Sequence, residues 1–335
     1  MKISEYGEFN LIEKITKDVI YDSRRVVVGI GDDTAAERVS PDHLLLSTCD
    51  ALVDGVHFLF NKISPRQLGR KSVAVNLSDI AAMGGRPTSI LITLALPKNT
   101  SVNWVEDLYI GIKEMCSLYK VNIMGGDMVS SPVVSINITA LGEVRPENLI
   151  KRSGACVGDA IMVTGPLGDS GAGLEIIKRG LEGDPYWSKL VEKHLEPIPQ
   201  VHEGQFLAQS GFVTSMNDIS DGLASEIREI SEASNVGIEL WEEKIPYSRL
   251  LLEAADKLTV SPIEMALSGG EDYQLVFTCK SDKVEELIKS FTKKFSKEVH
   301  LIGEVKSKEH GIKLKNLDGQ YKKLVTRGYD HFSSR

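Results

Sequence analysis

The order of apolar and polar positions predicts alternating strands and helices in the first half of the chain. Apolar residues at helical spacing predict a helix over residues 8–20. Short β-rich runs predict strands at residues 25–29, 43–47, 89–94, 121–124 and 133–140. Two further helices are expected, one from Ser64 to Met83 and one over residues 103–119. The first of these has Pro65 just inside its start and Gly84 just after its end, as helix termini favour.

The pattern breaks between Arg145 and Gly158, where proline, glycine and charged residues separate two well-patterned stretches. The second stretch predicts helices at residues 170–179, 201–209, 222–233 and 283–291, and strands at 160–163, 237–240 and 273–278. We therefore expect an N-terminal domain over residues 1–148 and a C-terminal domain over residues 149–335. The expected fold class is α+β (α/β), with mixed β-sheets layered with helices, because each sheet and helix has an apolar face to bury.

Charge and composition exclude several classes of protein. The chain has 39 Lys and Arg against 47 Asp and Glu, a net charge of −8, which argues against binding to nucleic-acid phosphates. Its longest uncharged apolar run, residues 90–96, is far shorter than the roughly 20 residues of a membrane-spanning helix. Acidic residues interrupt the first nine positions, where a signal peptide would be basic and then apolar, so a cytoplasmic location is expected. The four cysteines lie far apart, which predicts thiols and neither a zinc site nor a disulfide framework.

The candidate chemistry lies in the positions of the acidic residues. Carboxylates follow predicted strands at Asp33, Asp50 and Asp127, and Asp79 lies on a predicted helix. Asp218 and Asp221 lie between the apolar Phe212-Val213 segment and a predicted helix, and several of these acids stand beside glycines. Any one of them could be a turn residue or a helix cap. Asn76 and Asp79, however, lie three residues apart on one face of an otherwise apolar helix, where polar groups need partners. Carboxylates beside glycines hold hard cations and the phosphates they carry, so the set predicts one converging magnesium and nucleotide site.

Other signatures are missing or remain open. The sequence has no Gly-x-x-x-x-Gly-Lys-Ser/Thr phosphate loop, no Ser-His-Asp signature and no Asp-x-Asp-x-Asp-Gly calcium loop. The glycine-rich stretch at residues 165–173 follows a predicted strand and contains no lysine. It could hold phosphate at a helix N-terminus or form a tight structural turn.

Nine short motifs, in order along the whole chain, resemble those of the thiamine-monophosphate kinase family. They are Gly7-Glu-Phe-Asn-Leu11, Gly29-Ile-Gly-Asp-Asp33, Asp50-Ala-Leu-Val-Asp-Gly-Val-His-Phe58, Val75-Asn-Leu-Ser-Asp-Ile-Ala-Ala-Met-Gly84, Gly125-Gly-Asp127, Arg152-Ser-Gly154, Ser220-Asp-Gly-Leu223, Ser268-Gly-Gly-Glu-Asp-Tyr273 and Gly328-Tyr-Asp-His-Phe332. That family is related to aminoimidazole ribonucleotide synthetase and selenophosphate synthetase. The resemblance implies an ATP-binding N-terminal domain, a C-terminal α/β domain, a homodimer, and phosphorylation of thiamine phosphate by ATP to give thiamine diphosphate and ADP.

The resemblance also implies roles for individual residues. Ligands for several magnesium ions would be Asp33, Thr48, Cys49, Asp50, Asp79, Asp127, Asp218 and Asp221. ATP would contact Asp33, Tyr109, Gly126, Asp127, Arg152 and Ser220, while thiamine phosphate would contact His57, Glu271 and Tyr329. Asp50, Asp127 and Arg152 would carry catalysis. Cys49 stands where the family commonly has Thr, and because magnesium prefers hard oxygen we expect only its backbone carbonyl to bind metal.

The residues themselves leave alternatives to these roles. His57 could be a packed loop histidine, Tyr329 could tie down the C-terminus, and Arg152 could pair with a surface acid. The chain could be another ATP-dependent enzyme of the same superfamily or a non-enzymatic cation-binding module. A selenophosphate synthetase is disfavoured, because it would need a reactive cysteine near its N-terminus and the first cysteine is Cys49. No general base is assigned, because the attacking phosphate oxygen is already anionic near pH 7, and metal ions with Arg152 can offset phosphate repulsion.

Overall fold

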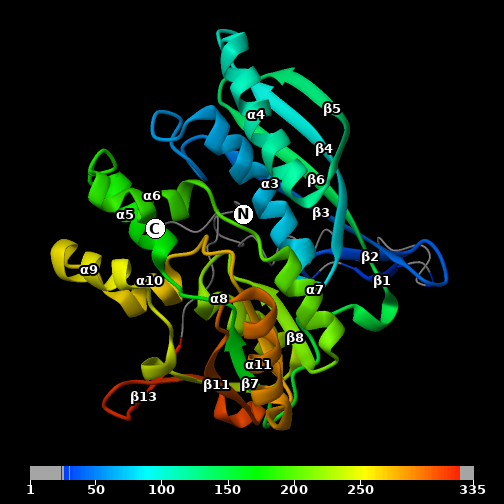
Figure 1. The fold of residues 1–335 in the computed structure, drawn as a ribbon, viewed down its shortest axis with the longest axis vertical. Helices are drawn as coiled ribbons and strands as arrows, with labels where there is room; N and C mark the ends of the chain where they lie inside the picture. The colour runs from blue at the N-terminus through cyan, green and yellow to red at the C-terminus, as the bar shows by residue number, and fades with distance from the viewer. Residues whose placement is uncertain (1–23, 25, 30, 325–335) are drawn as a thin grey trace, which may run out of the picture.

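The computed structural model describes residue 24, residues 26–29 and residues 31–324. The helix expected over residues 8–20, the motifs at residues 7–11 and 328–332, and Tyr329 lie outside these residues. The described part contains two mixed β-sheets with helices packed on them, one above the other along the long axis of the molecule (Figure 1). The expected fold class is therefore confirmed.

The first sheet has the strand order β1-β2-β3-β6-β4-β5. Its strands are β1 (Val26–Val28), β2 (Ala35–Arg38), β3 (Leu44–Val53), β4 (Arg86–Leu96), β5 (Asn122–Ser130) and β6 (Ser135–Val144). All neighbours are antiparallel except β4 and β5, which run parallel around the crossover helix α4 (Val102–Tyr119). The order places β3 near the middle of the sheet and β5 at its edge.

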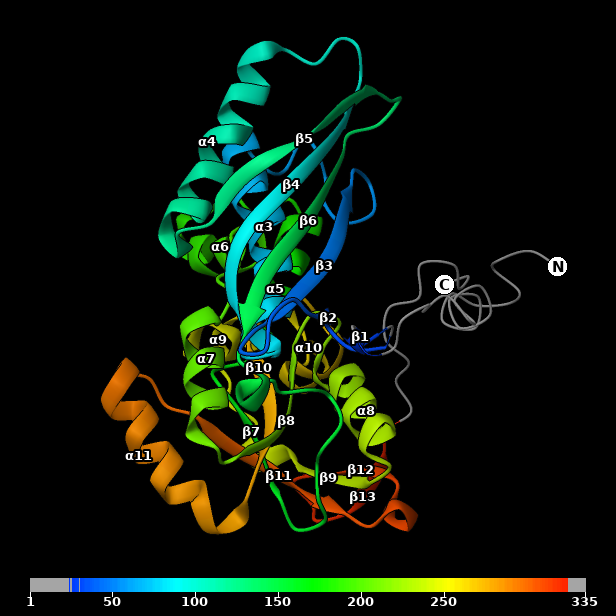
Figure 2. The same cartoon turned by 90° about the vertical axis from the view of Figure 1, so that its right-hand side faces the viewer.

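Helix α3 (Pro65–Ala82) packs on one face of this sheet and against α4 (Figure 2). Ser64 caps its start in a capping box with Gln67, which satisfies backbone groups that the first turn would leave without partners. The crossing of α3 and α4 requires glycine, because a Cβ on Gly111 would lie 1.8 Å from the carbonyl oxygen of Arg66. This close packing fixes the position of α3.

The second sheet has the strand order β13-β12-β9-β11-β7-β10-β8. Its strands are β7 (Ala160–Val163), β8 (Val213–Asp218), β9 (Gly237–Trp241), β10 (Leu275–Cys279), β11 (His300–Lys306), β12 (Ile312–Lys315) and β13 (Tyr321–Lys323). The helices of this half are α5 (Asp169–Lys178), α6 (Ser188–Leu195), α7 (Val201–Ser210), α8 (Leu223–Ser234), α9 (Arg249–Leu258), α10 (Pro262–Ser268) and α11 (Val284–Phe295). Short 3-10 turns lie at Pro146–Asn148, Pro185–Trp187, Glu242–Lys244, Ser281–Lys283 and Lys308–His310.

The two halves share a core around α3. Helices α5, α6 and α9 contribute Ile176, Leu190 and Leu251 to the buried cluster that also contains Leu77 and Ile92 of the first half. On its other side α3 contacts α7 and β8. The backbones of α3 and α7 meet so closely that a Cβ on Gly204 would lie 2.2 Å from the carbonyl oxygen of Ala81. Helices that follow residue 148 thus complete the core of the first sheet.

Most of the expected elements are present, with shifted ends. The strand at Ala160–Val163 matches its expected range, and α3, α4, α5, α7 and α8 begin and end within two residues of theirs. β3, β4 and β5 are each five residues longer than expected, because sheet pairing extends them. The expected elements did not include β2, β8, β11, β12, β13, α6, α9 and α10. No helix of the described residues is long and apolar enough to cross a membrane.

Candidate functional site

A cleft of about 800 Å³ is lined by residues of both halves. From the first half it takes Asp50, His57, Lys71 and Asp79, and from the second Asp218, Ser220, Asp221 and Glu271. Six of these were predicted from the sequence as metal or substrate ligands, and Ser220 as an ATP contact. The fold therefore brings together residues that are up to about two hundred positions apart in the chain.

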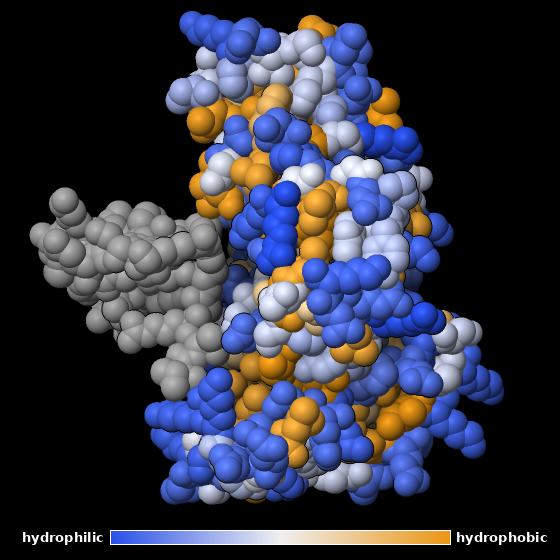
Figure 3. Space-filling model, turned by 90° about the vertical axis from the view of Figure 1, so that its left-hand side faces the viewer, coloured by the Kyte–Doolittle hydropathy of each residue, from blue (hydrophilic) through white to orange (hydrophobic). Residues whose placement is uncertain are grey.

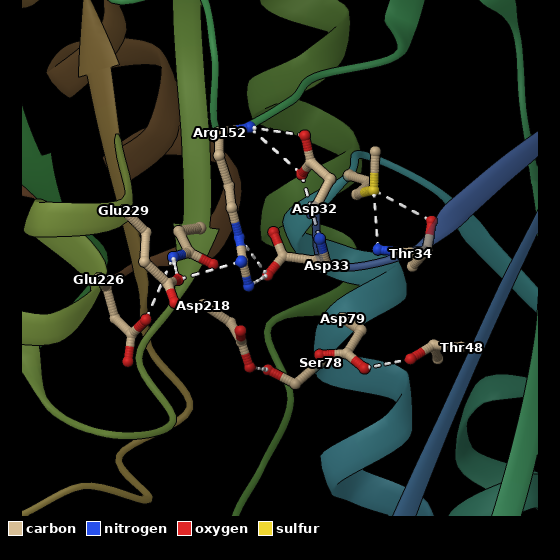
Figure 4. A network of polar contacts seen from close by, with 12 residues as sticks. Asp32, Asp33, Thr34, Thr48, Ser78, Asp79, Arg152, Asp218, Glu226 and Glu229 are labelled. Atoms are coloured by element: carbon tan, nitrogen blue, oxygen red, sulfur yellow. Dashed lines mark hydrogen bonds and ion pairs between the residues drawn. The ribbon is translucent and has the colours of Figure 1, made fainter. Parts of the chain in front are cut away.

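A cluster of three carboxylates lies beside this cleft. Asp33 follows β1, Asp79 lies near the end of α3, and Asp218 ends β8; each offers an oxygen within 4.8 Å of the others. The hydroxyl of Ser78 donates to Asp218 Oδ2 at 2.6 Å, and the hydroxyl of Thr48 donates to Asp79 Oδ2. Figure 4 shows these side chains converging from separate segments of the chain.

The cluster has more negative charge than the surrounding side chains balance. Burial, and then the neighbouring carboxylates, raise the pKa of Asp79 well above its usual value. Burial likewise raises the pKa of Asp33, and raises that of Asp218 to about 6. Asp33 Oδ2 is buried and has no hydrogen-bond partner among the described residues. Hard carboxylate oxygens at this spacing suit a divalent cation such as Mg²⁺, which would supply the missing positive charge.

Arg152 supplies the positive charge nearest to the cluster. Its guanidinium donates to Asp33 Oδ1 from Nη2 at 2.5 Å and from Nε at 3.1 Å, and its Nη1 lies 3.1 Å from Glu229 Oε2. Its backbone N–H points at the carboxylate of Asp32. Its main partner is therefore the buried Asp33 and not a surface acid, and its charge lies at the edge of the metal-binding cluster.

Thr48 and Asp50 lie on one face of strand β3, and Cys49 lies on the other, because the side chains of a strand alternate between the two faces. Thr48 contacts Asp79 on α3, and the backbone N–H of Asp50 donates to Asn76 Oδ1 at 3.1 Å. Successive side chains of a strand point to opposite faces, so the thiol of Cys49 lies on the other face of the sheet, where it is exposed. This geometry favours the expectation that Cys49 offers only its backbone carbonyl.

Glu271 and His57 lie in the same cleft. Glu271 Oε1 is 2.8 Å from Lys71 Nζ, and its Oε2 is 3.2 Å from His194 Nδ1. Although burial opposes its charge, these two neighbours lower the pKa of Glu271 below its usual value. His57 Nδ1 accepts from the backbone N–H of Val53 at 3.1 Å, so a neutral His57 carries its proton on Nε2.

Three predicted residues lie away from this cleft in the single chain. Tyr109 lies on α4 and packs against the core of the first sheet. Gly126 and Asp127 lie on the edge strand β5, and Asp127 pairs across the sheet with Thr93 of β4. Since β3, β6, β4 and β5 are neighbours, Asp127 is about 14 Å from β3 at the usual strand spacing. Their roles stay predictions from the sequence.

Four polar residues of the site were not predicted from the sequence. Lys71 and His194 contact Glu271, while Glu226 and Glu229 both accept from Asn217 Nδ2. One signal for Lys71 was available: it lies on the apolar helix that carries Asp79, eight residues earlier and so on nearly the same face. His194 gives no comparable signal, because its partner is distant in the sequence.

The chain is similar to known proteins over nearly its whole length. Family models match twice, as "AIR synthase related protein, N-terminal domain" over residues 31–144 and "AIR synthase related protein, C-terminal domain" over residues 157–315. The chain is 37% identical to the thiamine-monophosphate kinase of Buchnera aphidicola subsp. Schizaphis graminum, covering 98% of this chain and 99% of that protein. It is also 37% identical to that of Aquifex aeolicus, over 99% and 100%. The solved structure "AaThiL complexed with AMPPCP and TMP" is 36% identical, with a TM-score of 0.86 over 99% of both chains.

Proposed function

The chain belongs to the thiamine-monophosphate kinase family, and we propose that its cleft is where the γ-phosphate of ATP passes to thiamine phosphate, giving thiamine diphosphate and ADP. The observation that carries the proposal is the buried cluster of Asp33, Asp79 and Asp218, which comes from both halves and whose charge Arg152 balances only in part. A site of that kind suits two substrates that both carry phosphate.

Magnesium ions would be held by Asp33, Asp79 and Asp218, with Thr48 and Asp50 beside them on β3. When bound, such ions neutralise phosphate charge and so let two anionic groups approach each other. Asp221 lines the same cleft and is a further candidate ligand. Asp127 lies too far from this cluster within one chain, and it would join the site only through a second copy of the chain.

The residues of the chain act by position and charge. The acceptor phosphate oxygen is anionic near neutral pH, so no side chain has to remove a proton from it. Arg152 donates to Asp33 through Nε and Nη2, so its positive charge lies beside the cluster, where it would attract phosphate. The cleft aligns the two phosphates and reduces the entropic cost of bringing them together. Ser220 is proposed to face ATP, and His57 and Glu271 to face thiamine phosphate, since all three line the cleft.

We further propose that the protein is a homodimer formed through the edge of the first sheet. Every residue of β5 is exposed, including Met124 at 55% and Met128 at 59%. An edge strand of this length with apolar side chains is a template for pairing with another chain. The opposite side of the molecule, shown in Figure 3, is mainly hydrophilic with apolar residues in separate groups. Pairing through β5 would place Asp127 of one copy against the second copy of the chain. Asp127 would then join a site through the dimer.

Two measurements test the dimer. Light scattering should give twice the mass of the chain, and Met128→Lys, which puts a charge on the edge strand, should lower that mass. A fully active protein with the mass of one chain would overturn the dimer without affecting the kinase assignment. The cytoplasmic location expected from the first nine residues stays a prediction.

The kinase proposal is tested by measuring ADP formation from ATP and Mg²⁺ with thiamine phosphate as acceptor, and with free thiamine as control. We expect ADP release that depends on thiamine phosphate, while thiamine is a poor acceptor because it lacks the phosphate that the metal site requires. Equal turnover with thiamine would contradict the mechanism. ADP release with a different acceptor only would favour another enzyme of the superfamily, and no release would favour a cation-binding module.

A further inference from the structure

Lys71 is buried at the wall of the cleft in an unusual way. It is 0% exposed, which is rare for a lysine. Its ammonium contacts Glu271 Oε1 at 2.8 Å and the carbonyl oxygen of His194 at 3.2 Å. A buried charge is costly unless it is paired, so a fully buried lysine at a ligand cleft calls for a specific role.

The partner of Lys71 is held from several directions. Glu271 has a left-handed backbone with φ of 58°, which is uncommon for a residue other than glycine, and its N–H donates to the carbonyl of Ser220 at 2.6 Å. The next residue, Asp272, accepts from the backbone N–H groups of Gly168 and Ser170. The side chain of Glu271 is 24% exposed and lines the cleft, while those of Lys71 and His194 are 1% and 6% exposed. The Glu271 carboxylate therefore faces the cleft, and Lys71 and His194 lie behind it.

Helix α3 separates this group from the metal cluster by a fixed distance. Lys71, Val75 and Asp79 follow one another at intervals of four residues, and all three line the cleft. At 1.5 Å per residue, Lys71 and Asp79 are about 12 Å apart along the helix axis. An acceptor whose phosphate lies at the Asp79 end would place its rings toward the Lys71 end.

We infer that Lys71 and His194 are positioning residues that fix the Glu271 carboxylate at the ring end of the acceptor, where it selects a cationic ring over an uncharged one. The inference rests on the proposed function and deepens it. The thiazolium ring of thiamine phosphate carries a permanent positive charge, and a rigid carboxylate that needs no reorganisation binds such a charge best. Lys71 and His194 keep that carboxylate ionised and prevent it from turning away.

A catalytic relay through the same residues does not fit the geometry. Ser170 Oγ and Glu271 Oε2 both lie 3.2 Å from the same nitrogen, His194 Nδ1. A relay needs one partner on each ring nitrogen, so His194 cannot pass a proton from Ser170 to Glu271. Burial, followed by the charge of Lys71, lowers the pKa of His194 to about 4, so it is neutral at pH 7 and acts on Glu271 by contact.

The test compares Lys71→Met with Lys189→Met, a matched change at an exposed lysine of helix α6. Steady-state ADP formation should show the KM for thiamine phosphate raised about tenfold or more in Lys71→Met, with the KM for ATP within about twofold of the native value. Lys189→Met should change neither. Lys71→Arg, which keeps the charge, should recover part of the loss, and His194→Gln should shift the same KM by a smaller factor.

Ring selectivity separates positioning from a merely structural role. The probe is 5-(2-hydroxyethyl)-4-methylthiazole phosphate, used as a competitor of thiamine phosphate. It keeps the phosphate and the thiazole ring but lacks the aminopyrimidine group, and its ring is uncharged because the ring nitrogen is not quaternised. The native protein should prefer thiamine phosphate, and Glu271→Gln and Lys71→Met should both lose most of that preference. If Lys71→Met does not fold, Glu271→Gln and His194→Gln give the same comparison.

Two outcomes would overturn the inference. One is a folded Lys71→Met protein, or His194→Gln in its place, whose KM for thiamine phosphate is native. The other is an equal rise of both KM values with unchanged ring preference, which is what a structural role predicts. Both require a native protein that turns over thiamine phosphate. Absence of that turnover would instead refute the proposed function, so the two failures are distinguishable.

Discussion

Replacing Asp218 by Asn should make the metal-free protein more stable while it abolishes activity. Asp218 is 2% exposed, and burial raises its pKa from 3.8 to about 6. Asn has nearly the same volume and keeps an oxygen that can accept from the hydroxyl of Ser78. The substitution therefore removes a buried charge and conserves the hydrogen bond, and it deletes a metal ligand.

The expected gain follows from the pKa. A carboxyl with a raised pKa binds its proton more tightly when folded, so its contribution to stability is present below pH 3.8 and is lost as the pH rises through about 6. Two units of pKa correspond to about 3 kcal/mol at pH 8. Asp218→Asn should thus be up to about 3 kcal/mol more stable than the native chain at pH 8, or roughly 5 °C in Tm. Near pH 4 the difference should largely disappear.

The assay is thermal unfolding in the presence of a chelator at pH 4 and pH 8, repeated at pH 8 with Mg²⁺. Asp256→Asn, the same change at an exposed position on helix α9, is the control and should alter Tm by less than about 1 °C. Magnesium should raise the Tm of the native chain and have less effect on Asp218→Asn, because a ligand has been removed. An Asp218→Asn protein that is no more stable at pH 8, or equally stabilised at pH 4, would refute this account of the cluster.

Five other substitutions, at four positions, test separate parts of the description. Cys49→Ala and Cys49→Thr should keep the same magnesium dependence of the rate within about twofold, because the thiol is on the far face of β3 and magnesium prefers oxygen. A higher apparent magnesium affinity for Cys49→Thr beside a lower one for Cys49→Ala would show direct side-chain ligation. Asp50→Asn and Asp127→Asn should each lower kcat about 100-fold or more with the fold retained by circular dichroism, since metal sites lose heavily when a ligand charge is removed; near-native turnover at limiting Mg²⁺ in either would remove it from the ligand set. Gly111→Ala should lower the free energy of unfolding by about 1–3 kcal/mol, because its Cβ meets the carbonyl of Arg66 at 1.8 Å; an unchanged denaturation midpoint would contradict the close crossing of α3 and α4.

The elements that the sequence predicted best are those whose signals are local. Helix α3 has Ser64 and Pro65 at its start and Gly84 just after its end, and its expected and observed limits agree. Strands whose length depends on partners were underestimated: β5 continues through Gly125 and Gly126 only because β4 pairs alongside it. The short strand β13 is likewise supported by pairing with β12 and is exposed along its length. Strand β12 does alternate Ile312 and Leu314 with lysines, but it is only four residues long.

The residues of the candidate site also differ in whether the local sequence reveals them. Motif acids such as Asp33, Asp79 and Asp218 could be found as candidates, because carboxylates beside glycines have a recognisable pattern. Their mutual distances could not, since they depend on how two sheets meet across α3. The contacts of Lys71 and His194 with Glu271 became visible only in the fold, because Glu271 is 200 and 77 residues away from them in the chain.

The position of α3 between the two sheets has a consequence for how the protein unfolds. Separating the halves would leave the Lys71 ammonium without Glu271, deprive Ser78 of Asp218, and expose the contact of Ala81 with Gly204. Each loss is costly because these groups are buried. Neither sheet with its helices is then a stable intermediate without the other. We expect a single cooperative transition, with the calorimetric enthalpy equal to the van't Hoff enthalpy, in a chain whose length and two sheets would suggest two.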